Sequence, residues 1–119
     1  MIFLTAEDIA DFNSEIVPNG ARESSQVEAL SSRVLNAHYY ENVTDVYELA
    51  AMYMIAISRG HVFLDGNKRT AFQSGMLFLH LNGVDICDMP ALVEMMVDVA
   101  RGETGREELA QMLRELTER

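Results

Sequence analysis

The sequence predicts a compact all-α fold, because helical patterns cover most of its length and strand patterns are rare. Apolar residues recur three and four positions apart in several windows, the spacing of one helix face. Alternation with period two is limited to Met1–Leu4 and Val84–Cys87, which could form short extended pieces. The chain has 119 residues, about half of them apolar, so we expect a single domain over residues 1–119.

The N-terminal part is predicted to form two helices with a loop between them. Thr5 is a favourable N-cap and Asp8 supplies an acid at the third helical position, which indicates a helix near Thr5–Phe12. A Pro-Asn-Gly turn signal predicts a loop over Asn13–Ser24. The second helix is predicted from Ser25 to about Tyr40. The residues that recur at helical spacing are Val27, Leu30, Val34, Leu35 and His38.

Two central helices are predicted to form the core. Thr44 or Asp45 caps the first, which runs to about Arg59, and it is apolar on nearly every side. The second runs from Asn67 to about Asn82. Their connection, Gly60–Gly66, is short, so we expect the two helices to lie antiparallel as neighbours.

The C-terminal part is predicted to form two more helices. Pro90 suits the first turn of a helix that reaches Arg101 and is closed by Gly102. The last helix is amphipathic. Its apolar positions are Leu109, Met112, Leu113 and Leu116.

Composition excludes several classes of function. The formal net charge is −10, which argues against a direct nucleic-acid partner and favours a basic protein partner. Cys87 is the single cysteine and cannot form an internal disulfide, so a reducing cytoplasm is expected. We expect no signal peptide, and because the apolar runs are shorter than the ~20 residues that cross a bilayer, we expect no membrane partner.

The connection between the central helices carries an unusual group of polar residues. His61, Asp65, Asn67, Lys68 and Arg69 lie within nine positions. Polar groups without partners between two core helices would cost several kcal/mol. The segment is therefore either satisfied internally or open to a polar ligand.

The order of these residues favours an anionic ligand. Gly66 permits close backbone approach, and the helix that begins near Asn67 directs its free N–H groups at the connection. Lys68, which is the only lysine, and Arg69 place two cations where the helix dipole disfavours them. A bound phosphate would reverse that penalty. Asp65 could then hold Mg²⁺ beside the phosphates, and His61 could act as a general base. Together these are the parts that phosphoryl or nucleotidyl transfer requires.

Structural interpretations of the same residues remain open. Asp65 could be the N-cap of the following helix. Lys68 and Arg69 could be solvated charges or ion-pair partners. Single histidines at helix ends, such as His38 and His80, are more often structural hydrogen-bonding groups.

The central segment resembles the motif of the Fic/Doc superfamily, H-x-F-x-[D/E]-G-N-G-R-x-x-R. The matching residues are His61, Phe63, Asp65, Gly66, Asn67 and Arg69. Lys68 replaces the second glycine and Phe72 the last arginine, and both changes are typical of the Doc branch, H-x-F-x-D-[AG]-N-K-R-T-A. The flanking Ile57–Gly60 and Leu77–Val84 are similar to that branch as well.

This resemblance implies a toxin of a toxin–antitoxin pair. Such a toxin would be a protein kinase that transfers the γ-phosphate of ATP, or of another nucleoside triphosphate, to a threonine of elongation factor Tu and stops translation. The resemblance implies that His61 is the base and that Asp65 binds Mg²⁺. It implies that Gly66, Asn67, Lys68 and Arg69 hold the nucleotide phosphates. A separate antitoxin protein, docked as a helix, would restrain the toxin.

Alternatives of two kinds remain. Fic-type transfer of AMP keeps every role except the choice of phosphate, and a non-catalytic regulator keeps the motif only as a folding element. Lys68 would fill part of the phosphate pocket that a glycine leaves open. Phe72 would leave the site without the last arginine, a second group that could hold a phosphate. Both changes favour presentation of the γ-phosphate. We also expect Pro18–Arg22 to contribute to the target-binding surface.

Overall fold

The computed structural model describes residues 1–17, 25–60, 62–63, 66–86 and 89–117. Within these residues the chain forms helices and no strand, which confirms the all-α prediction. The helices are α1 (Ala6–Ile16), α2 (Ser25–Tyr40), α3 (Val46–Gly60), α4 (Asn67–Leu81), α5 (Met89–Ala100) and α6 (Arg106–Thr117).

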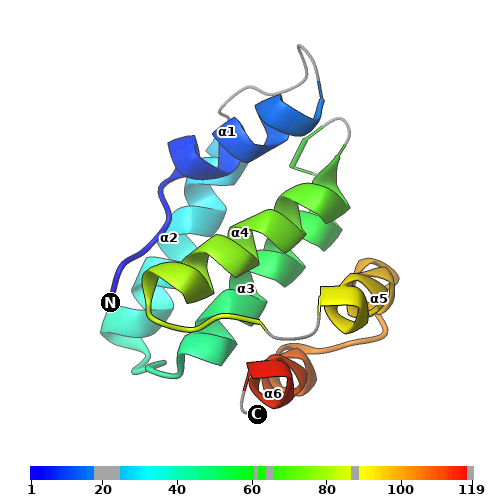
Figure 1. Ribbon diagram of the computed structural model, residues 1–119. Helices are drawn as coiled ribbons and strands as arrows, with labels where there is room; N and C mark the ends of the chain where they lie inside the picture. The colour runs from blue at the N-terminus through cyan, green and yellow to red at the C-terminus, as the bar shows by residue number, and fades with distance from the viewer. Residues whose placement is uncertain (18–24, 61, 64–65, 87–88, 118–119) are drawn as a thin grey trace.

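Helix α3 lies at the centre of the bundle and contacts α2, α4, α5 and α6 (Figure 1). Helix α4 lies antiparallel beside it, and α1 lies along α4, with the C-terminal end of α1 beside the start of α4. Buried side chains from all of these helices form one core cluster. In α3 the fully buried apolar residues are Leu49, Ala50, Ala51, Tyr53, Met54 and Ile57. The nearly all-apolar sequence of α3 therefore predicted its central position correctly. No helix of the described part is long and apolar enough to span a membrane.

A glycine lets the two central helices approach closely. A Cβ atom at Gly75 of α4 would lie 2.6 Å from the Met54 side chain of α3, which is too close for any larger residue to fit without movement. Glycine in a helix interior costs about 0.5–1 kcal/mol relative to alanine. The close packing of α3 on α4 offsets that cost.

The predicted caps hold α1 and α3 in place. Thr5 and Asp8 form a reciprocal capping box at the start of α1. Asp45, and not Thr44, caps α3, because its Oδ1 accepts a hydrogen bond of 2.9 Å from the Tyr47 N–H. The same carboxylate pairs with Arg114 of α6, which ties the last helix to the central one.

The predicted loop over Asn13–Ser24 was wrong for its first residues. Helix α1 continues to Ile16, because the buried Asn13 side chain is bonded to α4 and Val17 packs against the start of α4. The remainder, including the Pro18–Arg22 segment expected to contact the target, lies outside the described residues.

Met1–Leu4 and Val84–Ile86, from the two segments predicted as short extended pieces, belong to no helix or strand, and Cys87 lies outside the described residues. Side chains hold the N-terminal segment instead: Tyr53 accepts from the Leu4 N–H at 3.1 Å, and Asn82 bonds both backbone groups of Ile2. The Val84 N–H donates to the Leu79 carbonyl and closes the end of α4. Because these backbone groups already have partners, none of them is left to pair with a strand.

The buried phenol of Tyr53 predicts a loss of stability at alkaline pH. Burial raises its pKa to about 12, and the Leu4 hydrogen bond opposes this only in part. The folded state thus resists deprotonation of this phenol. The resulting contribution to the free energy of unfolding is complete below pH 10, and about 2–3 kcal/mol is lost as the pH rises towards 12. Urea unfolding across this range should show a smaller decline for Tyr53→Phe than for wild type. Tyr39→Phe, at an exposed tyrosine, is the control; equal declines in all three proteins would contradict the assignment.

Candidate functional site

The start of α4 has the geometry of an anion-binding helix end. Its N-cap residue is Gly66, in the left-handed conformation with φ +75°, and Gly66 has no side chain with which to cap the helix. Gly66 thus occupies the N-cap position, whereas Asp65, the residue considered for it from the sequence, lies outside the described residues. The first turn contains no acidic residue. The positive end of the helix dipole thus meets cations and not the acids that usually stabilise it.

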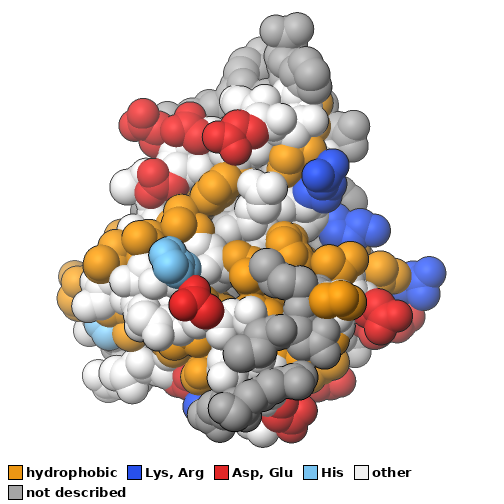
Figure 2. Space-filling model, in the orientation of Figure 1, with side chains coloured by type: hydrophobic (Ala, Val, Ile, Leu, Met, Phe, Trp, Pro, Cys, Tyr) orange, Lys and Arg blue, Asp and Glu red, His pale blue; other side chains and the backbone are white. Residues whose placement is uncertain are grey.

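Both cations of that turn are accessible. Lys68 and Arg69 are exposed. The ion pairs among the described residues involve other residues, which are His80 with Asp85, Arg106 with Glu48, and Arg114 with Asp45. Figure 2 shows acidic side chains along α1 and basic ones beside the start of α4. In a chain of net charge −10, this local excess of positive charge suits an anionic ligand.

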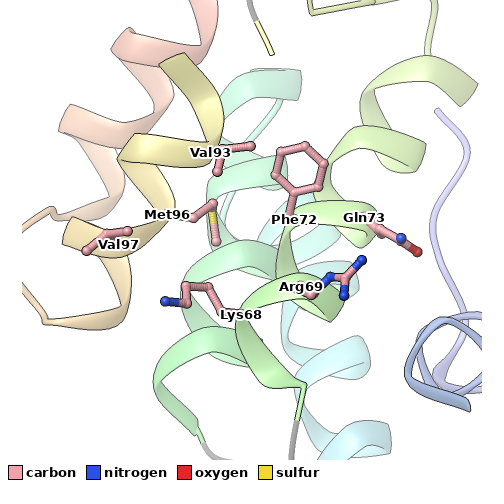
Figure 3. Close-up of a pocket in the computed structure, with 7 residues that line it drawn as sticks. All are labelled: Lys68, Arg69, Phe72, Gln73, Val93, Met96 and Val97. Atoms are coloured by element: carbon pink, nitrogen blue, oxygen red, sulfur yellow. The ribbon is translucent and has the colours of Figure 1, made fainter. Parts of the chain in front are cut away.

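A cavity of about 380 Å³ opens beside the two cations, between α4 and α5. Its lining residues are Lys68, Arg69, Phe72, Gln73, Val93, Met96 and Val97 (Figure 3). The Lys68 side chain points towards α5, the Arg69 side chain points towards Gln73, and the Phe72 ring lies further along α4, beside Val93. An apolar wall with cations at its rim suits a ligand that has both a flat apolar part and a charged part.

Asn67 braces the connection against α4. Its Oδ1 accepts from the Phe63 N–H at 3.0 Å and its Nδ2 donates to the Phe63 carbonyl at 2.9 Å. Phe63 is 6% exposed and belongs to the core. One of the two amide N–H groups of Asn67 is thus committed to the loop, so at most the other can contact a phosphate. Sequence reasoning assigned Asn67 to the phosphates and missed this bracing role.

Helix α1 supports the same turn from the opposite side. The Asn13 Nδ2 donates to the Thr70 hydroxyl at 3.2 Å, and both residues are fully buried. A Cβ atom at Gly66 would lie 2.8 Å from the Val17 side chain. Sequence reasoning missed Asn13 because the turn signal after it suggested a loop. The available signal was its spacing from Ile9 and Ala10, since Asn13 continues their buried helix face.

Comparison with known proteins identifies the family. The Fic/DOC family model matches residues 3–79, more than half of the chain. The chain belongs to the Fic/DOC family. It is 42% identical over 97 residues to the protein named "Protein kinase doc" of Escherichia phage P1, which covers 82% of this chain and 77% of that relative. It is 32% identical over 71 residues to "Toxin Doc" of Mycolicibacterium smegmatis, which covers 57% of this chain and 55% of that relative.

The Fic/DOC match includes α1–α3 and most of α4, so it covers the motif and its supports. The α5 wall of the cavity, with Val93, Met96 and Val97, comes from beyond the matched range. Phe72, which stands where Fic motifs carry their last arginine, lines this cavity as an apolar surface.

Two motif residues, His61 and Asp65, lie outside the described residues, so their roles as base and magnesium ligand stay predictions. The other histidines have the structural roles expected for them. The Nδ1 of His38 hydrogen-bonds the Val43 carbonyl at 3.0 Å, and His80 pairs with Asp85 at 2.7 Å. Within the part of the chain that the structure describes, no cluster of acids, histidines or cysteines could hold a metal ion.

Proposed function

We propose that this Fic/DOC protein is the toxin of a toxin–antitoxin pair and acts as a protein kinase in the bacterial cytoplasm. It transfers the γ-phosphate of ATP to a threonine of elongation factor Tu. The observation that carries the proposal is the glycine-capped start of α4, with Lys68 and Arg69 exposed beside a cavity that has an apolar wall. The names of the two relatives, one a kinase and one a toxin, support the same class of function.

The cavity suggests how ATP binds. The phosphates lie at the start of α4, where Lys68, Arg69 and the first N–H groups offset their charge. The adenine base of ATP lies against the apolar wall formed by Phe72, Val93 and Met96. Asp65, which precedes Gly66 in the sequence, would supply a carboxylate to Mg²⁺, and the bound ion would offset charge on the phosphates.

The chemical step assigns one role to each motif residue. His61 accepts the proton of the threonine hydroxyl as its oxygen attacks the γ-phosphorus. The bond from the γ-phosphorus to the bridging oxygen breaks, and ADP leaves with the electron pair. Lys68 and Arg69 offset the negative charge on the transferred group and on ADP. The Asn67 bond to Phe63 keeps the connection that carries His61 against the phosphate-binding turn.

Lys68 accounts for the choice of phosphate. Its side chain lines the cavity and extends towards α5, into space that the glycine of Fic motifs would leave open. Phe72, in place of the last arginine of Fic motifs, has no charged group to hold a second phosphate. Both features favour a nucleotide orientation that presents the γ-phosphate and not the α-phosphate.

ATP labelled at one phosphate tests the reaction. In a bacterial lysate, γ-label is expected on a protein of the size of elongation factor Tu, and mass spectrometry should place it on a threonine. α-Label on that protein would show that the reaction is AMP transfer and not phosphate transfer. No label from either position would leave the non-catalytic alternative.

Lys68→Ala is expected to lower kcat/KM for ATP by about 10- to 100-fold, because a charge-assisted hydrogen bond contributes about 1.5–3 kcal/mol. Arg101→Ala, which removes an equal charge from an exposed position outside the cavity lining, is the control and should retain wild-type activity. Equal activity in both variants would remove Lys68 from the phosphate site.

The proposed antitoxin is a separate protein, consistent with a relative named as a toxin. The acidic chain favours basic residues on that partner.

A further inference from the structure

We propose that Asn13 is a positioning residue, which fixes the first turn of α4 through Thr70 and Gly66. The effect on phosphate transfer rests on the proposed function, whereas the effect on the turn itself does not. Asn13 lies far from the motif in sequence, and the bond to Thr70 spans 57 positions.

Asn13 is buried and is hydrogen-bonded to the first turn of α4. It is 0% exposed, as is Thr70, and its Nδ2 donates to the Thr70 Oγ1 at 3.2 Å. Burial of an amide costs free energy unless hydrogen bonds compensate for the lost water, and the bond to Thr70 supplies part of that compensation. An apolar residue could fill the same volume, but it could not fix how far α4 is rotated about its axis.

Asn13 contacts both ends of one helical turn. Besides Thr70 it approaches Gly66, where a Cβ atom would lie 3.1 Å from its Nδ2. The Thr70 N–H donates to the Gly66 carbonyl at 2.9 Å and closes the turn. Residues four apart share one helix face, so Gly66 and Thr70 face α1. Lys68 and Arg69, which lie between them, are exposed and line the cavity.

A small movement of this turn would move both cations. Misplacement of catalytic groups by about 1 Å can lower a rate about 100-fold. The Asn13–Thr70 bond therefore acts on the reaction through the placement of Lys68 and Arg69, without contact to the nucleotide.

Paired substitutions separate positioning from stability. Thr70→Val keeps the shape of the side chain and removes the acceptor, whereas Thr70→Ser keeps the acceptor. Asn13→Leu keeps the volume and removes the donor. Ser31→Ala removes a buried hydroxyl that bonds the Leu4 carbonyl elsewhere in the fold and is the control for stability.

We expect Thr70→Val and Asn13→Leu to lower kcat for γ-phosphate transfer by about 10- to 100-fold. Thr70→Ser and Ser31→Ala should stay within about twofold of wild type, even where their melting temperatures fall equally. Wild-type kcat in Asn13→Leu would overturn the proposal. So would a loss in Thr70→Ser equal to that in Thr70→Val, or rates that simply follow the melting temperatures.

Amide hydrogen exchange tests the same inference without any assumption about the reaction. In Asn13→Leu the Thr70 amide should exchange about tenfold faster, while amides in the middle of α3 keep wild-type rates. Unchanged exchange at Thr70 would overturn the proposal even if the kinase assay succeeds. If wild type transfers no phosphate but exchange accelerates as expected, the proposed function fails and the positioning of the turn stands.

Discussion

His61→Ala is expected to lower phosphate transfer by about 100- to 10,000-fold, the usual contribution of a general base. His61 directly follows Gly60, the last residue of α3, and precedes Phe63, whose backbone Asn67 holds against the start of α4. The substitution changes none of the described residues that form the core cluster, so the variant should keep its fold and its affinity for the antitoxin.

The measurements are transfer of γ-label, growth arrest on expression, and the far-UV spectrum of the purified variant. His80→Ala is the matched control, since it removes an imidazole whose partner is Asp85, at the opposite end of α4. It should retain full activity and toxicity. Toxicity that survives His61→Ala would disprove the assignment of the base and favour a binding protein without catalysis.

Gly66→Ala is expected to lower phosphate transfer by at least about 100-fold, because two effects act at the same atom. At φ +75° a side chain is strained, which costs about 1–2 kcal/mol. The new Cβ would also lie 2.8 Å from the Val17 side chain and 3.1 Å from the Asn13 amide. Helix α1 or the first turn of α4 must then shift, and Lys68 and Arg69 shift with that turn.

Gly83→Ala separates these two effects. Gly83 has a similar backbone angle, φ +84°, but a Cβ atom there would meet nothing within 4 Å. The Gly83→Ala substitution should lower the free energy of unfolding by about 1–2 kcal/mol through backbone strain alone and leave phosphate transfer unchanged. Gly66→Ala should lower stability further and remove activity. Equal losses of stability in the two variants, with activity intact in both, would show that the contact with α1 is unimportant.

Most helix boundaries could be predicted because they depend on neighbours in the sequence. Thr5 and Asp8 cap α1 within one turn of the helix, and Asp45 caps α3 through an N–H two residues later. Glycine in the left-handed conformation follows the ends of α4 and α5 at Gly83 and Gly102. The error at the end of α1 has the opposite cause, because Asn13 and Val17 are held by α4, which is distant in sequence.

The candidate site divides in the same way. The order of residues from Gly66 to Arg69 by itself determined a helix end with cations beside it, since those groups are adjacent along the chain. Sequence also determined the central place of α3, because a helix without a polar face can only be buried.

Only the tertiary structure decided what surrounds that helix end. It placed α5 opposite Phe72, which makes a cavity with an apolar wall, and it placed Asn13 of α1 behind the turn. It also showed that Asn67 holds Phe63 in addition to any phosphate. These contacts join side chains from different helices or across a loop. Helical periodicity identifies which face of a helix is buried, but it does not identify which residue of another segment that face meets.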